Sequence, residues 1–511
     1  MLQPMQNIGT IHSGEKRDVV VIGGALSGAS TALLLKRKDP TLRILLIEKN
    51  TEFKRRVGEA TVEVSGYFLC RILGLTRFLT QTQLCKNGLR FWFSNHESHD
   101  LGSCSEVGGK YLSTVPSFLV DRSVLDEEVL SRAKAEGVEI LRPASVKSVE
   151  LVAGGEQLLH LDTESGPRDL QARWVVDASG VRALLARDHG WWRQNEDHPT
   201  LSAWSRWRGV KDWDDEKIAK KYPQMASGYV GIRGTATNHF MGDGWWAWWI
   251  SLKGGETSIG IVLDQRKASW PQEGGSLEEK IRNFLSEHTA AHEMMEGAEC
   301  VEGDVNFRRN LPYSSTLFSG DGFVLVGDAH AFLDPFYSPG MDWVAFSSLA
   351  AVKLIMAWRR GEDHKSMSDG MNQRFASCYE RMYEALYQNK YDYIGDYDLM
   401  RLAFHLDISF YYFFVARHLF RGGEEGFADL PFVASRAYPV FALMRCYNRR
   451  LAAMGRKRRE LGSFGCHNAH QRDLFAGFNF NAIHLLKIIS RALASWLLLE
   501  CKEGWRSWGS R

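Results

Sequence analysis

The stretch that most constrains the fold is a glycine-rich turn close to the start of the chain, GGALSG at residues 23–28. A short apolar run at residues 19–22 precedes it, and helical spacing of apolar residues follows over about residues 25–38. A second apolar run covers residues 44–47. Strand, turn, helix and strand in this order predict a right-handed β-α-β unit.

Four positions in this unit carry the chemistry of a nucleotide site. Gly23 can make the tight turn, and Gly28 allows the helix to pack closely, so the helix N-terminus can face a pyrophosphate. Ala25 stands at the middle position of the glycine pattern, where its methyl group narrows the space for the pyrophosphate but does not exclude it. Glu48 ends the second strand, where a carboxylate can accept hydrogen bonds from ribose hydroxyls.

Composition excludes several other classes of protein. The chain has 511 residues, 44% of them hydrophobic, which is enough for more than one domain. Its 63 basic and 61 acidic residues nearly cancel, so no global field favours nucleic acid. Eight scattered cysteines without paired spacing indicate a reducing, cytoplasmic location and no metal site. No charge-free apolar run of about 18 residues stands out, so no membrane span is predicted.

Strand and helix signals along the chain predict an α/β protein in four segments. Residues 17–195 and 306–350 form a Rossmann-like nucleotide-binding domain in two parts. Between them, residues 196–305 form an inserted mixed or antiparallel sheet that binds the substrate. Prolines then become sparse and helical spacing dominates, so residues 351–511 are predicted to be helical.

Two further motifs identify the nucleotide. VGDAHAFLDPFYSPG, residues 326–340, places Asp328 directly after an apolar strand, and VVDASGVRALLAR covers residues 175–187. Both resemble segments of the flavin monooxygenases, in which the aspartate holds the ribityl chain of FAD. The resemblance implies FAD as cofactor, with Pro335 and Gly340 as further contacts.

Three other motifs resemble one branch of that superfamily, the flavin-dependent halogenases. They are GEATVE at residues 58–63, a V-D-R helix within residues 118–141, and WAWWIS at residues 246–251. In a strand, Trp246 and Trp248 share one face. The resemblance implies that these two indoles wall the flavin off from the substrate and so prevent ordinary hydroxylation. An aromatic core strand is the alternative interpretation.

Halogenases of this kind pass hypohalous acid to a lysine on a strand after the G-E-A-T segment. In KNGLRFWF, residues 86–93, the matching position is Arg90, whose guanidinium stays protonated and can orient an oxidant by hydrogen bonds. If the whole stretch is a strand, Lys86 lies on the same face but more than about 10 Å away. Arg90 is therefore the predicted catalytic residue.

The halide loop of the family also differs here. Its two backbone donors align with Ser338, Pro339 and Gly340, and proline has no N–H. Tyr337 stands where tryptophan halogenases have a catalytic glutamate. One donor is thus predicted to be missing from the halide site.

Three functions remain open. The first is an FAD-dependent oxidoreductase that uses reduced FAD and oxygen to hydroxylate an aromatic or large apolar substrate without halide. The second is a true halogenase with Arg90 in place of the lysine, and the third is a catalytically silent flavin-binding partner protein. The indoles and the stretch FYYFF at residues 410–414 favour an aromatic substrate, although such a stretch is more often helix core.

Partners are predicted from what the chain lacks and from one basic run. No second complete dinucleotide fingerprint is present, so a separate flavin reductase could supply reduced FAD. The basic run at residues 445–460 is most simply a solvated helix face, but it could dock an acyl carrier protein with a bound substrate. His330, beside the flavin loop, is interpreted as structural rather than as a proton donor.

Overall fold

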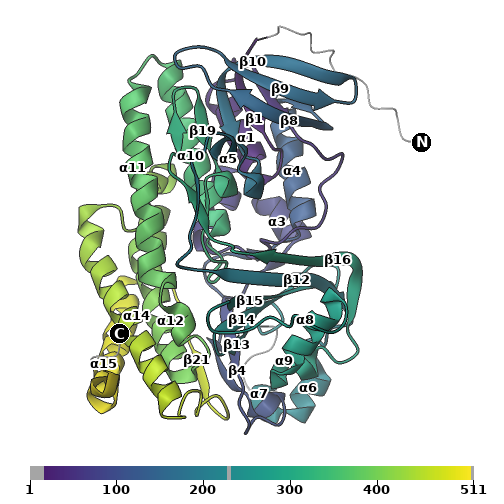
Figure 1. The fold of residues 1–511 in the computed structure, drawn as a ribbon. Helices are drawn as coiled ribbons and strands as arrows, with labels where there is room; N and C mark the ends of the chain where they lie inside the picture. Colours follow the sequence, from purple (N-terminus) through teal and green to yellow (C-terminus); the bar gives the residue numbers. More distant parts are fainter. Residues whose placement is uncertain (1–15, 227–231, 508–511) are drawn as a thin grey trace.

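The computed structural model describes residues 16–226 and 232–507. It contains two large sheets and a set of C-terminal helices that stand alongside both of them (Figure 1). The upper sheet in this view is the nucleotide-binding one, and the lower sheet carries the tryptophan-rich strand. The predicted α/β architecture is confirmed.

The first sheet has parallel strands at its centre. Its order is β18-β19-β10-β1-β2-β7, and β8 and β9 extend it from β10. The bounds are β1 (Lys16–Ile22), β2 (Ile44–Ile47), β7 (Glu139–Leu141), β8 (Ala144–Glu150), β9 (Gln157–Thr163), β10 (Gly166–Asp177), β18 (Ser319–Gly320) and β19 (Phe323–Leu325). Central strands such as β1 are apolar on both faces because helices α1 (Leu26–Lys38), α4 (Arg122–Ala135) and α5 (Leu184–Asp188) accompany this sheet. The predicted β-α-β unit is confirmed to within a few residues.

The second sheet is mixed and mostly antiparallel, with the order β16-β12-β15-β14-β13-β4-β5-β21. Its strands are β4 (Leu89–Phe93), β5 (Ser105–Gly109), β12 (Thr200–Arg208), β13 (Thr237–Gly242), β14 (Trp245–Ser251), β15 (Thr257–Asp264), β16 (Glu299–Arg309) and β21 (Arg472–Phe475). In β14, Trp246 and Trp248 pack into the main core, whereas Ala247 and Trp249 pack into a separate core beneath helices α8 (Leu277–Ser286) and α9 (Thr289–Met294). The predicted alternation of side chains is confirmed.

This sheet reaches beyond the insertion predicted from the sequence. Strands β4 and β5 come from the segment assigned to the nucleotide-binding domain, and β21 comes from the predicted helical region. Such strands join a sheet through long-range pairing, β4 to β13 and β21 to β5, and a local sequence pattern does not reveal that pairing.

The remaining short elements connect these sheets. They are α2 (Glu63–Tyr67), α3 (Thr76–Thr82), α6 (Glu216–Lys221), α7 (Pro223–Ala226), β3 (Leu84–Cys85), β6 (Phe118–Leu119), β11 (Trp192–Gln194), β17 (Tyr313–Ser315) and β20 (Ala331–Phe332).

Helices dominate the chain after residue 340. They are α10 (Gly340–Arg359), α11 (His364–Met382), α12 (Tyr397–Phe410), α13 (Arg417–Gly422), α14 (Tyr438–Glu460) and α15 (Ala482–Lys502). Three helical stretches of the described chain are long and apolar enough to cross a membrane, namely α10, Tyr397–Ala428 and α15. Each of them contains charged residues, such as Lys353 in α10, Asp407 in the second stretch and Lys487 in α15, so the expectation that no charge-free apolar run of this length exists is not contradicted. The first two are 72% and 61% buried in the protein, but α15 is only 17% buried.

Candidate active site

A cavity of about 680 Å³ lies at the carboxyl ends of the parallel strands, where the glycine turn meets α1. Gly23 has a left-handed φ of 100°, and a Cβ on it would lie 2.4 Å from the carbonyl oxygen of Ala178. A Cβ on Gly28 would lie 1.8 Å from the carbonyl oxygen of Gly23. Only glycine fits at both positions, while Ala25 lines the cavity as the N-cap residue of α1.

Glu48 lies buried at the end of β2 and lines the same cavity. Its two carboxylate oxygens accept the backbone N–H groups of Gly24 at 2.8 Å and Asn50 at 2.9 Å. A carboxylate has about four acceptor positions, so further hydrogen bonds from a ribose can still form. These contacts fix Glu48 at the position that the sequence predicted for it.

The cavity fits an anionic dinucleotide. Asp328 lines it, and burial raises the pKa of this carboxyl, although the guanidinium groups of Arg122, Arg308 and Arg56 oppose the shift. The same three arginines line the cavity, so a diphosphate would meet both positive side chains and the N-terminus of α1. Pro335 and Gly340 also line it. The candidate cofactor residues therefore surround one space.

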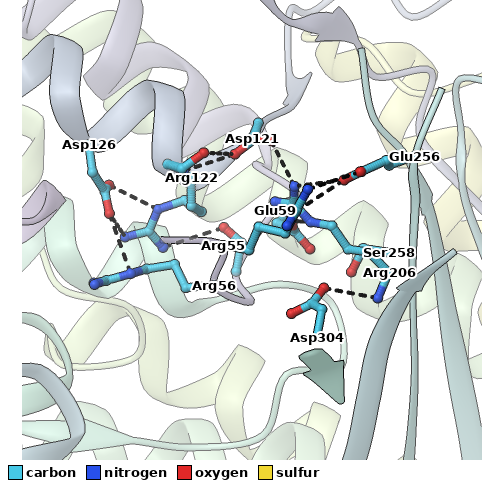
Figure 2. Close-up of polar contacts among 12 residues, drawn as sticks. Arg55, Arg56, Glu59, Asp121, Arg122, Asp126, Arg206, Glu256, Ser258 and Asp304 are labelled. Carbon is cyan, nitrogen blue, oxygen red and sulfur yellow. Dashed lines mark hydrogen bonds and ion pairs between the residues drawn. The ribbon is translucent and has the colours of Figure 1, made fainter. Parts of the chain in front are cut away.

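An ion-pair cluster clamps the GEA segment beside this cavity (Figure 2). Arg206 of β12 donates to Glu59 at 3.0 Å and to Asp121 at 2.8 Å, and it also pairs with Glu256. Burial raises the pKa of Glu59 to about 7 despite the Arg206 charge. The clamp fixes the loop after β2 to the second sheet, so both sheets contribute to the wall of the cofactor cavity.

Trp246 and Trp248 line the cofactor cavity with their indoles held by hydrogen bonds. Trp246 donates to the hydroxyl of Tyr391 at 2.9 Å, and that hydroxyl donates in turn to Asp334 at 2.9 Å. Trp248 donates to Ser258 at 3.2 Å. Trp246 and Trp248 are thus part of the hydrophobic core and also part of the cavity wall. The predicted role of these indoles in excluding hydroxylation stays a prediction.

The loop between Asp334 and α10 passes along the cofactor cavity. Tyr337 and Ser338 take left-handed φ values of 69° and 56°, and Pro339 is the N-cap residue of α10. The Ser338 N–H is used within the loop, by the carbonyl of Pro335 at 2.9 Å. The next two N–H groups, those of Gly340 and Met341, donate to no described residue, as expected for the first turn of a helix.

The predicted loss of a halide donor at Pro339 stays a prediction, but the neighbouring backbone offers two other donors. Gly340 and Met341 are consecutive, both line the cofactor cavity, and both N–H groups lie at the positive end of α10.

A second, mostly apolar cavity of about 240 Å³ lies between the nucleotide-binding domain and the C-terminal helices. Phe410, Tyr411, Tyr412 and Phe414 line it, so the FYYFF stretch forms a pocket wall and is not simply helix core. The two cavities share three lining residues: Pro339, Trp343 and Met382. These three residues therefore form the boundary between the two cavities.

Lys86 lies buried in the wall of this second cavity. Its Nζ donates to the carbonyl oxygen of Thr61 at 2.8 Å, in the segment that carries the G-E-A-T motif. Burial lowers the pKa of the amine to about 8, although Glu63 and Asp342 oppose the shift. Lys86 therefore places an amine with a lowered pKa in the wall of the second cavity.

The prediction that Lys86 is a distant strand residue is wrong. Strand β4 begins only at Leu89, because Gly88 has a left-handed φ of 77° and breaks the extended chain. The period-two spacing used to place Lys86 does not apply before that break. The Asn-Gly pair after Lys86 is a turn signal that could have revealed this.

The assignment of Arg90 as the catalytic residue is also wrong in its geometry. Arg90 lies on β4 with its side chain on the opposite face from Leu89, which lines the second cavity. Its guanidinium is fully buried, pairs with Glu106 and donates to the carbonyl of Gly109 at 2.7 Å. Burial opposes ionisation of Glu106, but Arg90 and Arg233 outweigh it and lower the pKa of that carboxyl to about 2. Arg90 lines neither cavity.

Several carboxyl groups line the second cavity with Lys86, and two of them, Glu63 and Asp342, act on the charge of the amine, although no sequence motif singled them out. Glu63 accepts the hydroxyl of Tyr412 at 2.6 Å. Asp342, in the first turn of α10, accepts the backbone N–H of Ser65 at 2.8 Å. Burial raises the pKa of Asp342 to about 8 against the effect of the Ser65 hydrogen bonds. An acid in the first turn of a helix usually complements the dipole, so sequence alone did not single it out.

The structure shows the surroundings of His330 and of the basic run on α14. His330 is buried against Trp343 and Phe375, lines neither cavity, and burial lowers its pKa to about 3, so it is structural. The basic run on α14 is largely neutralised by carboxylates of the same chain. The paired cations are Arg445, Arg450, Arg456, Lys457, Arg458 and Arg459. Most of these cations are therefore engaged within the chain, although Arg445 and Arg449 are exposed, and docking of an acyl carrier protein here stays a prediction.

The family model for tryptophan halogenases matches residues 18–111 and 102–393 of this chain. The chain belongs to the tryptophan halogenase family. Members of this family are FAD-dependent oxidoreductases, so the enzyme class and the cofactor follow from that membership.

Several halogenases are similar in sequence to this halogenase family member. A flavin-dependent halogenase of Dictyostelium discoideum is 25% identical over 434 residues, which cover 77% of this chain and 69% of the relative. The 1H-pyrrole-2-carbonyl peptidyl-carrier-protein chlorinase of Pseudomonas fluorescens is 25% identical over 410 residues, covering 76% and 84%. A sulochrin halogenase of Aspergillus terreus is 27% identical over 375 residues, covering 68% and 64%.

Solved structures show that this halogenase family member shares its fold along nearly the whole chain. The crystal structure of halogenase PltM superposes with a TM-score of 0.74 at 18% identity, covering 94% of this chain and 97% of that one. The flavin-dependent brominase Bmp2 gives 0.66 at 20% identity, covering 85% and 100%.

We expect Arg90→Met to change the stability of this halogenase family member and leave its chemistry intact. Removing one partner of a buried ion pair costs about 3–5 kcal/mol, because the other charge stays desolvated. Chemical denaturation measures the loss, and turnover per folded molecule should stay within about two-fold. A variant with normal stability and no turnover would show that Arg90 has a catalytic role.

Proposed function

We propose that this protein is a halogenase that uses reduced FAD, oxygen and a halide to halogenate a free aromatic substrate of the phenol type. The observation that carries the proposal is the buried amine of Lys86 in the cavity that meets the cofactor cavity at Pro339. Family membership favours this function over hydroxylation without halide. A catalytically silent flavin-binding protein would not require a buried lysine with a lowered pKa.

The halide would bind at the N-terminus of α10. The consecutive N–H groups of Gly340 and Met341 are free to donate, and the helix dipole adds positive potential at the same point. Bound FAD, once reduced, supplies the oxidising equivalent from oxygen that converts the halide to hypohalous acid. The chain contributes the halide position and the passage to the second cavity.

Lys86 would receive the electrophilic halogen in the second cavity. Its pKa of about 8 leaves a useful fraction of the neutral, nucleophilic amine at neutral pH, which an arginine would not provide. The overall step is balanced: an aromatic C–H and hypohalous acid give an aromatic carbon–halogen bond and water. The ring proton must be taken up as that bond forms.

Asp342 is the proposed acceptor of that proton. Glu63 already accepts the Tyr412 hydroxyl, whereas Asp342 accepts the backbone N–H of Ser65 and shares the cavity with Lys86. A carboxylate with a pKa near the working pH is well suited as a general base. The first turn of α10 would thus hold the halide through its backbone and the base through a side chain.

The cavity favours a compact aromatic substrate. It is small and lined mainly by aromatic and aliphatic side chains, with polar groups that include Lys86, Glu63, Asp342 and Asp407. Its volume of about 240 Å³ suits one or two rings. A separate flavin reductase is the proposed source of reduced FAD. A carrier-bound substrate, as in the name of the Pseudomonas fluorescens relative, is a second possibility for the test below.

The test is a reconstituted reaction. Purified protein, FAD, a flavin reductase, NADH, oxygen and either bromide or chloride are mixed with a panel of free phenols and indoles, and products are identified by mass spectrometry. We expect halogenated phenols that require halide and the protein. Hydroxylated products that form without halide would contradict the proposal and support the oxygenating interpretation. Product only from carrier-linked aromatic acids would overturn the free-substrate part.

A further inference from the structure

Helix α15 presents an apolar stripe to the outside of the molecule. Ile483, Leu486, Leu497 and Leu498 are 67%, 49%, 57% and 62% exposed, and Trp505 in the following turn is 56% exposed. The opposite face, with Leu485, Ile489 and Ala492, is buried against the neighbouring helices. In Figure 1 the helix lies at the outer edge of the C-terminal helices. Exposed apolar residues gathered in this way mark a surface that another body covers.

The charges around the stripe are all of one sign. Lys487, Arg491, Lys502 and Arg506 form no ion pair with any described residue, and the first three are exposed along one edge of the stripe. The acids of the same segment are turned toward the protein. Glu500 is bound by Arg450 at 2.9 Å, and Glu503 is bound by Arg458.

Helical geometry places the two features side by side. At 3.6 residues per turn, positions 483, 486, 494 and 497 form the centre of the exposed face, and positions 487, 491 and 502 flank it. Although α15 has the length and composition of a membrane span, Lys487 and Arg491 would then lie inside the hydrocarbon. A helix with an apolar stripe, a basic flank and a nearby tryptophan suits the interface plane of a bilayer instead.

We propose that α15 and the turn Gly504–Ser507 form a docking surface for an anionic lipid bilayer. The apolar stripe would enter the headgroup region, and the four cations would meet anionic lipid headgroups. A second copy of the chain fits less well. A two-fold contact through this stripe would bring the two cationic flanks together, with no acid exposed on either to offset them.

The docking surface adjoins the second cavity. The segment that leads into α15 includes Phe475, Phe478 and Asn479, and all three line that cavity. An apolar aromatic compound dissolved in the membrane would therefore be delivered close to the cavity wall. This inference does not depend on which reaction the enzyme performs.

The test uses full-length protein loaded with FAD and vesicles of phosphatidylcholine, with or without phosphatidylglycerol. We expect the protein to sediment with the anionic vesicles and to remain in solution with phosphatidylcholine alone. High salt should release it, since the cationic part of the attraction is screened. Two double variants, Lys487→Glu with Arg491→Glu and Leu497→Gln with Leu498→Gln, should each weaken binding at least about ten-fold.

A matched charge control separates this surface from net charge. Arg77→Glu with Lys134→Glu changes the net charge equally at exposed positions on α3 and α4, far from α15, and should bind as the wild type does. Thermal melting confirms that each variant is folded. The proposal fails if no vesicle binds the protein, or if the control loses as much binding as the α15 variants. A dimer that Leu497→Gln with Leu498→Gln dissociates, without vesicle binding, would assign the surface to a second copy.

Discussion

Replacing Lys86 by alanine is expected to abolish halogenation, with a loss in kcat of at least about 10³-fold. The reason is that Lys86 supplies a buried amine to the second cavity, whereas the guanidinium of Arg90 faces the other side of the sheet and lines neither cavity. Single-turnover formation of brominated phenol measures the loss. FAD binding and the melting temperature should change little, because the only hydrogen bond removed is the one to Thr61.

Two further variants define what the amine does. Lys86→Arg keeps the positive charge but stays protonated, so it should remain inactive if the neutral amine is the acceptor of halogen. Asn87→Ala alters the neighbouring residue of the same cavity wall and should retain activity. Full activity in Lys86→Ala would remove the observation that carries the proposed function.

Asp342→Asn is expected to lower kcat by about 10²- to 10⁴-fold, the usual contribution of a general base. Burial raises the pKa of this carboxyl to about 8, so below that pH it is mostly protonated and cannot accept the proton of the ring. The wild-type rate should therefore rise with pH up to about 8. In the Asp342→Asn variant the rise should become shallower, because the amine of Lys86, whose pKa is lowered to about 8, then titrates without Asp342.

The matched control is Glu63, another carboxyl group that lines this cavity. Glu63→Gln removes a charge of the same kind, but Glu63 is held by the Tyr412 hydroxyl, so we expect a smaller effect and an unchanged pH profile. The amine of Lys86 also has a pKa of about 8. A pH profile in Asp342→Asn as steep as that of the wild type would assign the titration to Lys86 alone and exclude Asp342 as the base.

The cofactor site could be predicted from the sequence because its requirements are local. Gly23 and Gly28 are dictated by backbone clashes within a short β-α-β unit, and Glu48 follows from the length of that unit. Asp328 directly follows an apolar strand in the same way. Each of these residues lies where its immediate neighbours in the sequence place it. The structure brings Gly23, Glu48 and Asp328 to one cavity, and Gly28 packs against the carbonyl of Gly23.

The reactive residues could not be predicted with the same rules. Lys86 was misplaced because one glycine, Gly88, ends the extended geometry, and Arg90 was misassigned because alternation turned it to the wrong face. Asp342 meets Lys86 only through packing of α10 against the loop before β4. Contacts between segments more than 200 residues apart leave no periodic trace in either segment.

The separate rims of the two cavities bear on the order in which ligands associate. The cofactor cavity has the exposed residues Arg55 and Val57 among those that line it, whereas the substrate cavity has Tyr111 and Leu112. The two cavities share only Pro339, Trp343 and Met382 among their described lining residues. The flavin and the aromatic substrate can therefore each enter without passing through the other's cavity. Steady-state kinetics should thus follow a random sequential scheme, with product departing while the flavin remains seated for its next reduction or exchange.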